Sequence, residues 1–378
     1  MNGLLQISLK LLVNDRAKFF TLIVGITFAV VLMLMMTSLF AGIMQRTAAV
    51  IYNVGAKVWV MDPSVNTQTD NIPMPDYILD LVRSIEGVKF AVPLYSGTGL
   101  VKLPDGRYQA TTVIGLDDAT LFGRPHMLQG DIIDIYSDDA YIVIEDSEFS
   151  KLNSPYIGST FEINNNRAIV MGLGEALMSG LFGTPTIYTT YNRALSALPQ
   201  MPYTITYILV EPKTTQDIKN IQQKVSDSGY IALTQQEFIT RNKNYYLYQT
   251  GLGTNILIMT LISFIVGLSI AGQTFYTFVI EHIEQFGALK AIGIKKKELI
   301  QMILFQSSVV GFIGYGLGML IAMVLIALAK YRLANYAALV TFDSLIFTFL
   351  MVLVIVAFSS YLGIRKVTKI DPFDIFRG

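Results

Sequence analysis

Four long runs without a charged side chain constrain the fold of this chain more than any other feature of its sequence. A charged residue at the centre of a bilayer costs about 2.5–3.5 kcal/mol, so runs of this kind are typical of membrane-spanning helices. About 20 helical residues cross the roughly 30 Å of hydrocarbon in a bilayer, and each run is at least that long. We therefore predict four transmembrane helices, at residues 19–45, 251–280, 299–329 and 344–364.

Composition agrees with a membrane protein and excludes several classes of function. Only 15% of the 378 residues are charged, well below the roughly 25% of a soluble domain. The 28 Lys and Arg residues balance the 28 Asp and Glu residues, and a chain without net positive charge is not expected to bind nucleic acid. Cysteine is absent, which excludes disulfides, thiolate zinc sites and cysteine nucleophiles. Two histidines, His126 and His282, leave little material for a histidine-based metal site.

Basic residues beside the spans predict the orientation of the chain, because cytoplasmic flanks are enriched in Lys and Arg. They concentrate at residues 1–18, 281–298 and 365–378, whereas the short loop 330–343 carries only two. We therefore expect a cytoplasmic N-terminal segment, a cytoplasmic loop 281–298 and a cytoplasmic tail. Residues 46–250 and the short loop are expected on the other side of the membrane.

The N-terminal segment, residues 1–18, precedes the first span. Leu5, Leu9 and Leu12 stand at helical spacing in it, which predicts a short amphipathic helix at the membrane surface. A plain solvated leader is the alternative. The apolar run that follows is longer than the apolar region of a cleaved signal peptide, so we expect it to remain as an anchor.

The segment between the first two spans, residues 46–250, is large enough for an independent domain with its own core. β-branched and aromatic residues favour strands at residues 57–61, 110–116, 140–145 and 203–210. Apolar residues at helical spacing predict helices at residues 76–86 and 214–225. Thr214 and Asp217 are spaced as a capping box, and turn residues between about 92 and 200 favour a β-rich insertion. We predict an α+β domain with two subdomains.

Several catalytic and transport functions find no support in the sequence. The phosphate-binding pattern G-x-x-x-x-G-K-[ST] is absent, so any ATP that drives this chain is bound by another chain. None of the four runs contains an ionisable side chain of Asp, Glu, Lys, Arg or His, which argues against a proton-coupled carrier or an ion channel. We interpret Glu281, His282 and Glu284 as marking the end of a span rather than as metal ligands. We therefore predict no catalytic residue, no metal and no bound cofactor in this chain.

Glycines and tyrosines suggest two further features of the spans. Three glycines of the third span predict close packing against another helix, within the chain or between two copies: Gly311, Gly314 and Gly318. Membrane helices also tolerate glycine without such a contact. Three tyrosines before the second span fit an aromatic belt at the membrane surface or the mouth of a site for an amphiphilic substrate: Tyr245, Tyr246 and Tyr248.

Segment 281–298 is the most informative part of the sequence. It begins as a polar helix that leaves the membrane, breaks near Gly293 and re-enters after Lys295–Lys297. A short helix between two spans suits the docking of a cytoplasmic partner, whereas an ordinary basic loop would only satisfy the positive-inside rule.

Three stretches of the chain resemble FtsX/MacB-type ABC transporter permeases. QFGALKAIG, residues 285–293, is similar to the family signature E-x-G-x-L-[KR]-A-[LI]-G-A, although Gln285 stands where the family usually has Glu. KIDPFDIFR, residues 369–377, is similar to the tail of the same family. GAKVWVMDP, residues 55–63, looks like the DevC-like branch, whose permeases are separate chains.

The resemblance implies a type VII, mechanotransmission permease of the bacterial inner membrane, without catalytic activity of its own. Two cytoplasmic ABC ATPase subunits would hold ATP and Mg, and two copies of the chain would pair. The resemblance assigns the coupling to the ATPase to Gln285, Phe286, Gly287, Ala288, Leu289, Lys290, Ala291 and Gly293.

The same resemblance implies what the periplasmic domain does. Its movement would drive lipidic or amphiphilic cargo through a membrane-fusion adaptor and a TolC-like outer-membrane channel. The chain would also contact membrane lipid, and no nucleic acid is expected to bind it. An FtsX-like regulator of a periplasmic hydrolase and a lipoprotein-extracting permease are the alternatives.

Overall fold

The computed structural model of this chain describes residues 2–178, 183–198, 203–333 and 335–368. The chain divides into two compact units. We call residues 1–42 and 253–378 the helical bundle and residues 43–252 the inserted domain. The stretch KIDPFDIFR at residues 369–377 lies outside the described residues.

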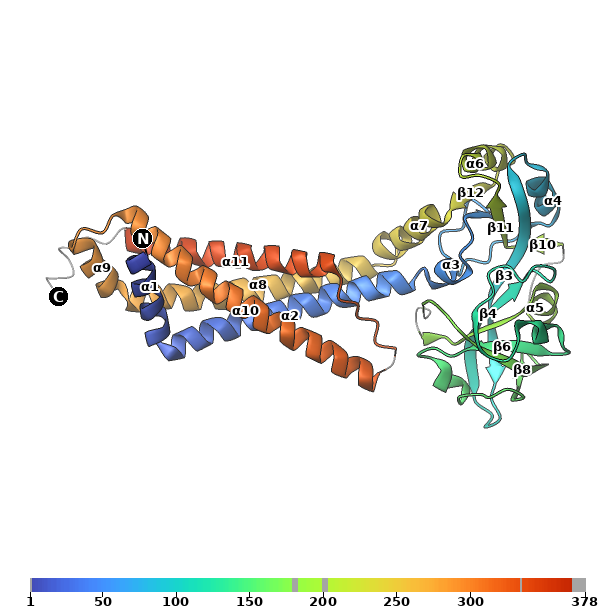
Figure 1. Ribbon diagram of the computed structural model, residues 1–378, viewed down its shortest axis with the longest axis horizontal. Helices are drawn as coiled ribbons and strands as arrows, with labels where there is room; N and C mark the ends of the chain where they lie inside the picture. The colour runs from blue at the N-terminus through green and yellow to red at the C-terminus, as the bar shows by residue number, and fades with distance from the viewer. Residues whose placement is uncertain (1, 179–182, 199–202, 334, 369–378) are drawn as a thin grey trace. The chain divides into compact units, whose positions relative to one another are not determined.

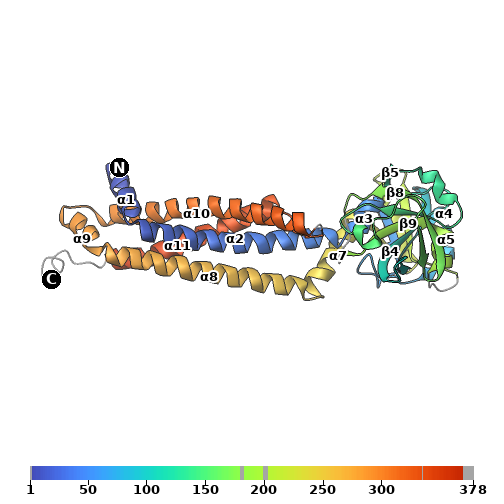
Figure 2. The same cartoon turned by 90° about the horizontal axis from the view of Figure 1, so that it is seen from below.

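The helical bundle contains four long helices (Figure 1). Its helices are α1 Asn2–Asn14, α2 Arg16–Arg46, α8 Leu252–Glu281, α9 Ile283–Ala291, α10 Lys296–Arg332 and α11 Phe342–Thr368. Among the described residues, α2, α8, α10 and α11 are long and apolar enough to cross a membrane. The prediction of four transmembrane helices is therefore confirmed. Figure 2 shows α2 running along α8 and α10.

Helix α1 packs on the first turns of α10 through polar as well as apolar contacts. Ser8 is fully buried, and its Oγ donates a hydrogen bond to the Met302 carbonyl over 3.0 Å. Gln306 Nε2 donates to the Ser8 carbonyl over 2.9 Å. The amphipathic helix at the membrane surface stays a prediction. Leu12 is buried but Leu9 is 40% exposed, because the face centred on Ser8 meets the bundle.

Within the described residues of the inserted domain, ten strands form one mixed sheet with the order β12-β1-β11-β3-β4-β9-β6-β8-β5, and β7 pairs with β3 and β8. The strands of this sheet are β1 Val58–Met61, β3 Val88–Lys102, β4 Tyr108–Leu116, β5 His126–Gln129, β6 Ala140–Ile144, β7 Thr160–Ile163, β8 Asn166–Glu175, β9 Thr186–Thr190, β11 Tyr207–Pro212 and β12 Ile231–Thr234. Two short strands, β2 Met74–Pro75 and β10 Thr204–Ile205, pair separately. The helices are α3 Ala49–Val54, α4 Tyr77–Ser84, α5 Tyr191–Ala197, α6 Asp217–Asp227 and α7 Gln235–Tyr248.

The predicted α+β architecture of this domain is confirmed. The long pair β3 and β4, in register from Leu94↔Leu116 to Lys102↔Tyr108, joins its two ends. Figure 1 shows α4, α6 and β11 at one end, and β6, β8 and α5 at the other. Each end has its own apolar core, with Ile208 and Val82 in one and Val143 and Phe161 in the other. The two ends share one sheet.

Two local predictions in this domain need correction. Residues 203–210 do not form one strand, because β10 ends at Ile205 and β11 begins at Tyr207. Thr214 and Asp217 do not form a reciprocal capping box. The Asp217 carboxylate accepts hydrogen bonds from both the backbone N–H and Oγ1 of Thr214, over 2.9 and 2.8 Å.

A reciprocal capping box is found at the start of α7. Thr234 Oγ1 accepts from the Glu237 N–H over 3.2 Å, and Glu237 Oε2 accepts from the Thr234 N–H over 2.7 Å. The sequence Thr-Gln-Gln-Glu has the spacing of a capping box and could have predicted it. This cap fixes where α7, which leads back to the membrane helices, begins.

Candidate functional site: the α9 hairpin and the groove along α7

The α9 hairpin, residues 282–295, connects α8 to α10 through two sharp breaks. His282 interrupts the helix after Glu281 with φ −97° and ψ 17°. The second break lies at Gly293, whose φ of 101° is a conformation that favours glycine. The N–H of Lys295 donates to Glu298 Oε2 over 2.9 Å and so caps the start of α10. The local sequence therefore builds a short helix with a fixed turn on each side.

Two of the predicted coupling residues are buried against the bundle in this chain. Phe286 is fully buried in an apolar core that includes Leu12, Leu299 and Val367. Gly287 beside it is buried as well. These residues anchor α9 to the bundle. The sequence alone did not show which face of α9 would be buried, because a nine-residue helix has too few turns for a clear apolar pattern.

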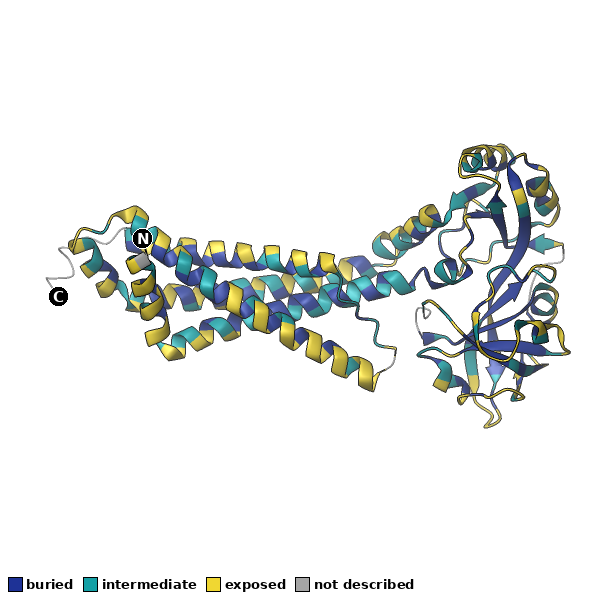
Figure 3. Ribbon diagram, viewed as in Figure 1, coloured by how far each residue is buried: buried dark blue, intermediate teal, exposed yellow. Residues whose placement is uncertain are grey.

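The other six coupling residues are half-buried or exposed, in a hairpin that Figure 3 draws with exposed stretches. Leu289 and Lys290 are half-buried, and the remaining four are exposed: Gln285, Ala288, Ala291 and Gly293. Ile292 is 82% exposed and was not among the predicted residues. It shares a helix face with Gln285 and Ala288, which lie seven and four residues before it. The sequence feature that could have pointed to Ile292 is an apolar residue placed between the helix and a run of lysines.

Charged residues tie the end of α8 to the junction between α1 and α2. Lys18 of α2 makes an ion pair with Glu281 and a second one with Asp15, the latter over 3.1 Å. Burial raises the pKa of the Asp15 carboxyl, but its hydrogen bonds with Lys18 outweigh this effect and leave that pKa below its ordinary value. His282 Nδ1 lies 2.9 Å from the Phe278 carbonyl. In the described part of the chain, no three His, Asp or Glu side chains come together to hold a metal ion.

The three glycines of α10 that were predicted to pack closely lie at contacts within the chain. A Cβ at Gly314 would stand 2.8 Å from Ile26 Cγ2 on α2, and one at Gly318 would stand 2.6 Å from Val30 Cβ. A Cβ at Gly311 would stand 2.5 Å from Val356 Cγ2 on α11. Gly267 of α8 makes a similar approach to Ala29 of α2. Small residues thus bring α8 and α10 close to α2, as in other membrane helix pairs.

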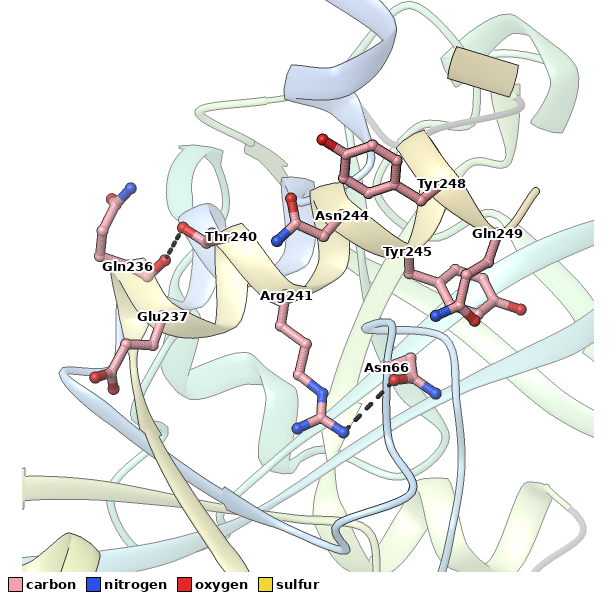
Figure 4. Close-up of a pocket in the computed structure, with 9 residues that line it drawn as sticks. All are labelled: Asn66, Gln236, Glu237, Thr240, Arg241, Asn244, Tyr245, Tyr248 and Gln249. Carbon is pink, nitrogen blue, oxygen red and sulfur yellow. Dashed lines mark hydrogen bonds between the residues drawn. The ribbon is translucent and has the colours of Figure 1, made fainter. Parts of the chain in front are cut away.

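A groove of about 490 Å³ runs along α7 in the inserted domain (Figure 4). Residues with polar groups and two tyrosines line it: Asn66, Gln236, Glu237, Thr240, Arg241, Asn244, Tyr245, Tyr248 and Gln249. The Arg241 guanidinium donates to the Pro63 carbonyl over 2.5 Å and to Asn66 Oδ1 over 3.5 Å, which holds it at one wall. Two of the three predicted tyrosines, Tyr245 and Tyr248, line the groove. A cation, amides and aromatic rings suit a molecule with polar and apolar parts.

Comparison with known proteins identifies the class to which this fold belongs. The FtsX-like permease C-terminal domain matches residues 256–372, and the MacB-like periplasmic core domain matches residues 19–228. The second match covers more than half of the chain, so the chain belongs to the MacB/FtsX family of ABC transporter permeases. It is therefore a membrane protein with an extracytoplasmic domain. The DevC-like branch stays a prediction.

Individual relatives are distant. The macrolide export ATP-binding/permease protein MacB of Pasteurella multocida is 24% identical over 84% of this chain and 50% of its own length. A putative hemin transport permease, HrtB of Staphylococcus haemolyticus, is 32% identical over 33% of this chain and 34% of its own. The chain thus spans a third to a half of the length of these two relatives.

Two further matches cover their counterparts more fully. An uncharacterised ABC transporter permease of Mycobacterium tuberculosis is 22% identical over 94% of this chain and 93% of its own length. The solved periplasmic region of MacB from Actinobacillus actinomycetemcomitans is 13% identical, covering 51% of this chain and 96% of that one, with a TM-score of 0.38.

Proposed function

We propose that this chain is the non-catalytic permease subunit of an ABC exporter, driven by two separate ATPase subunits. The observation that supports this most directly is the α9 hairpin, which Phe286 fixes to the bundle and which leaves Gln285, Ala288 and Ile292 exposed. In this proposal the hairpin and both termini lie in the cytoplasm of a bacterium, and the inserted domain lies in the periplasm. ATP and Mg are held by the ATPase subunits, since this chain has no P-loop.

Two contacts allow movement of the α9 hairpin to reach α2. Phe286 shares a buried core with Leu12 of α1, and α1 leads into α2 at Asp15. Lys18 of α2 pairs with Glu281, the last residue of α8. The chain continues from α2 and α8 into the inserted domain. ATP binding on the partner is thereby converted into movement of that domain.

The names of two relatives and the α7 groove support an amphiphilic cargo. MacB is named for macrolide export and HrtB for hemin transport. Both compounds combine a large apolar surface with polar groups, which is also the character of the groove beside Arg241 and Tyr248. We propose that cargo enters from the periplasm and leaves through an adaptor and a TolC-like channel. Two copies of the chain pair in the working complex.

Binding to the ATPase tests the proposal. The chain is co-expressed with a candidate partner P-loop ATPase, as wild type, as Ile292→Asp and as Tyr331→Asp. The two positions are matched in exposure, at 82% and 86%, and Ile292 follows α9 whereas Tyr331 lies in the last turn of α10. Ile292→Asp is expected to lose the ATPase on co-purification, because an unpaired carboxylate is costly in an apolar contact. Tyr331→Asp is expected to retain it. Equal recovery with both variants would contradict docking at the hairpin.

A further inference from the structure

The chain passes between its two units twice, and the two passages differ in backbone structure. The first lies within α2, which is helical without interruption from Arg16 to Arg46. The second lies between α7, which ends at Tyr248, and α8, which begins at Leu252. Gly251 in this gap has φ 73° and breaks the helical path. Movement can therefore travel along α2 more directly than along the interrupted return.

A buried amide side chain connects these two passages inside the inserted domain. Asn242 of α7 is completely buried. Its Nδ2 donates a hydrogen bond over 2.8 Å to the carbonyl of Thr47, the first residue after α2. Its Oδ1 accepts from the Gln68 N–H over 3.2 Å, and Gln68 Oε1 accepts from the Val50 N–H over 2.9 Å. We call Thr47, Val50, Gln68 and Asn242 the hinge clamp.

The hinge clamp satisfies backbone groups that the break between α2 and α3 leaves unpaired. The last carbonyls of a helix and the first N–H groups of the next have no partner within their own helix. Thr47 supplies such a carbonyl and Val50 such an N–H, on opposite sides of the break. Two side-chain amides, from Asn242 and Gln68, bind them away from solvent. Two residues distant in sequence therefore hold the backbone at the break after α2.

Further hydrogen bonds connect the hinge clamp to the sheet. Tyr207 of β11 is buried, and its hydroxyl donates to the carbonyls of Asp70 and Thr67, over 2.8 and 3.2 Å. These two residues flank Gln68 and hold its loop against the sheet. Gln235, at the start of α7, adds a bond from its Nε2 to the Ile51 carbonyl of α3 over 3.1 Å. A displacement at the end of α2 is thus imposed on α7 and on the sheet.

We infer that Asn242 is a positioning residue that makes α7 and the sheet follow the end of α2, so that the inserted domain moves as one body. The inference rests on the proposed function, because it assigns this residue a part in transmitting ATP-driven movement. In this inference the amide group of Asn242 is needed, and an apolar side chain of similar size at this position would not replace it. Loss of the amide leaves the ATPase running while the inserted domain no longer responds.

The test compares hydrogen exchange of the inserted domain with and without ATP in the full complex with its ATPase. The variants are Asn242→Leu, which removes both bonds, and Asn242→Asp, which keeps an acceptor for the Gln68 N–H but loses the donor to Thr47. Asn220→Leu is the control, because it removes one exposed hydrogen bond, to the Glu86 carbonyl over 2.9 Å, elsewhere in the domain. ATP turnover of each complex is measured in parallel.

We expect wild type and Asn220→Leu to show an ATP-dependent change in exchange across the sheet. Both Asn242 variants should lose that change while ATP turnover continues, and Asn242→Asp serves where Asn242→Leu does not fold. A merely structural role would lower thermal stability without removing the response to ATP in the folded complex. A retained response in a folded Asn242 variant would overturn this inference alone. Absence of the response in wild type would overturn the proposed function and this inference with it.

Discussion

Gly318 of α10 lies directly against Val30 of α2, so that a Cβ on the glycine would stand 2.6 Å from the valine Cβ. The Thr27 carbonyl would lie 2.9 Å from the same added atom. No side chain fits without separating the two helices, and the contact stabilises the bundle through close backbone packing. Because α2 also leads into the inserted domain, this contact bears on both stability and coupling.

Enlarging this glycine should destabilise the bundle. Gly318→Leu is expected to cost about 1–3 kcal/mol, because the added atoms force the helices apart. Gly316→Leu is the matched control, since an added Cβ there meets no atom of the described residues within 4 Å. Thermal unfolding in detergent measures both variants. Equal melting temperatures would contradict the α2–α10 packing described above.

The one tryptophan of the chain should report on the inserted domain alone. Trp59 is 1% exposed, and its ring centroid lies 5.8 Å from that of Tyr207 and 5.5 Å from that of Phe238. A tryptophan buried among apolar rings emits at shorter wavelength and is shielded from iodide. We expect a blue-shifted emission that moves to the red when the domain unfolds. Strong iodide quenching of the native protein would contradict this environment.

The absence of cysteine makes the proposed orientation easy to test by labelling intact cells. Tyr156→Cys in the inserted domain replaces a residue that is 73% exposed, and Ile292→Cys in the α9 hairpin one that is 82% exposed. A membrane-impermeant maleimide should label the first without lysis and the second only after lysis, because cytoplasmic flanks carry the basic residues. Labelling of position 292 in intact cells would contradict the proposed orientation.

The ion pair at the start of α2 should give acid-sensitive stability. The pKa of Asp15 lies below its ordinary 3.8 in the folded protein, so its carboxylate contributes stability above that pH. This contribution is lost as the pH falls through the lower, folded-state pKa. Asp15→Asn should therefore lower the melting temperature at neutral pH, and the difference from wild type should vanish in acid. The exposed Asp138→Asn serves as the control. A difference that persists unchanged into acid would contradict the role of Lys18 as partner.

Several parts of this architecture could be predicted from the sequence because a single physical cost decides them. A charge inside the membrane is expensive, so the four spans follow from where charges are missing. The spacing of Gly314 and Gly318 shows that one helix face allows a close approach. It does not show that α2 is the neighbour, because that depends on the packing of all four helices.

Other parts depend on contacts between distant residues. Val58 of β1 pairs with Val210 and with Thr234, partners more than a hundred residues away, so the strand order could not be predicted. Phe286 belongs to the sequence signature, yet only the fold shows that it anchors the hairpin. Asn242 looks like one polar residue among many in α7. Its burial against Thr47 depends on how the chain returns to the end of α2.

In the proposed function, ATP binding on a partner moves the inserted domain relative to the membrane helices. Spin labels at Tyr156→Cys and Tyr331→Cys place one reporter in each unit, at residues that are 73% and 86% exposed. The distance distribution between them is measured in the complex with its ATPase, without nucleotide and with ATP trapped. We expect the distribution to shift with ATP and the shift to be absent when Ile292→Asp prevents docking. An unchanged distribution in an ATP-bound wild-type complex would contradict the proposed function.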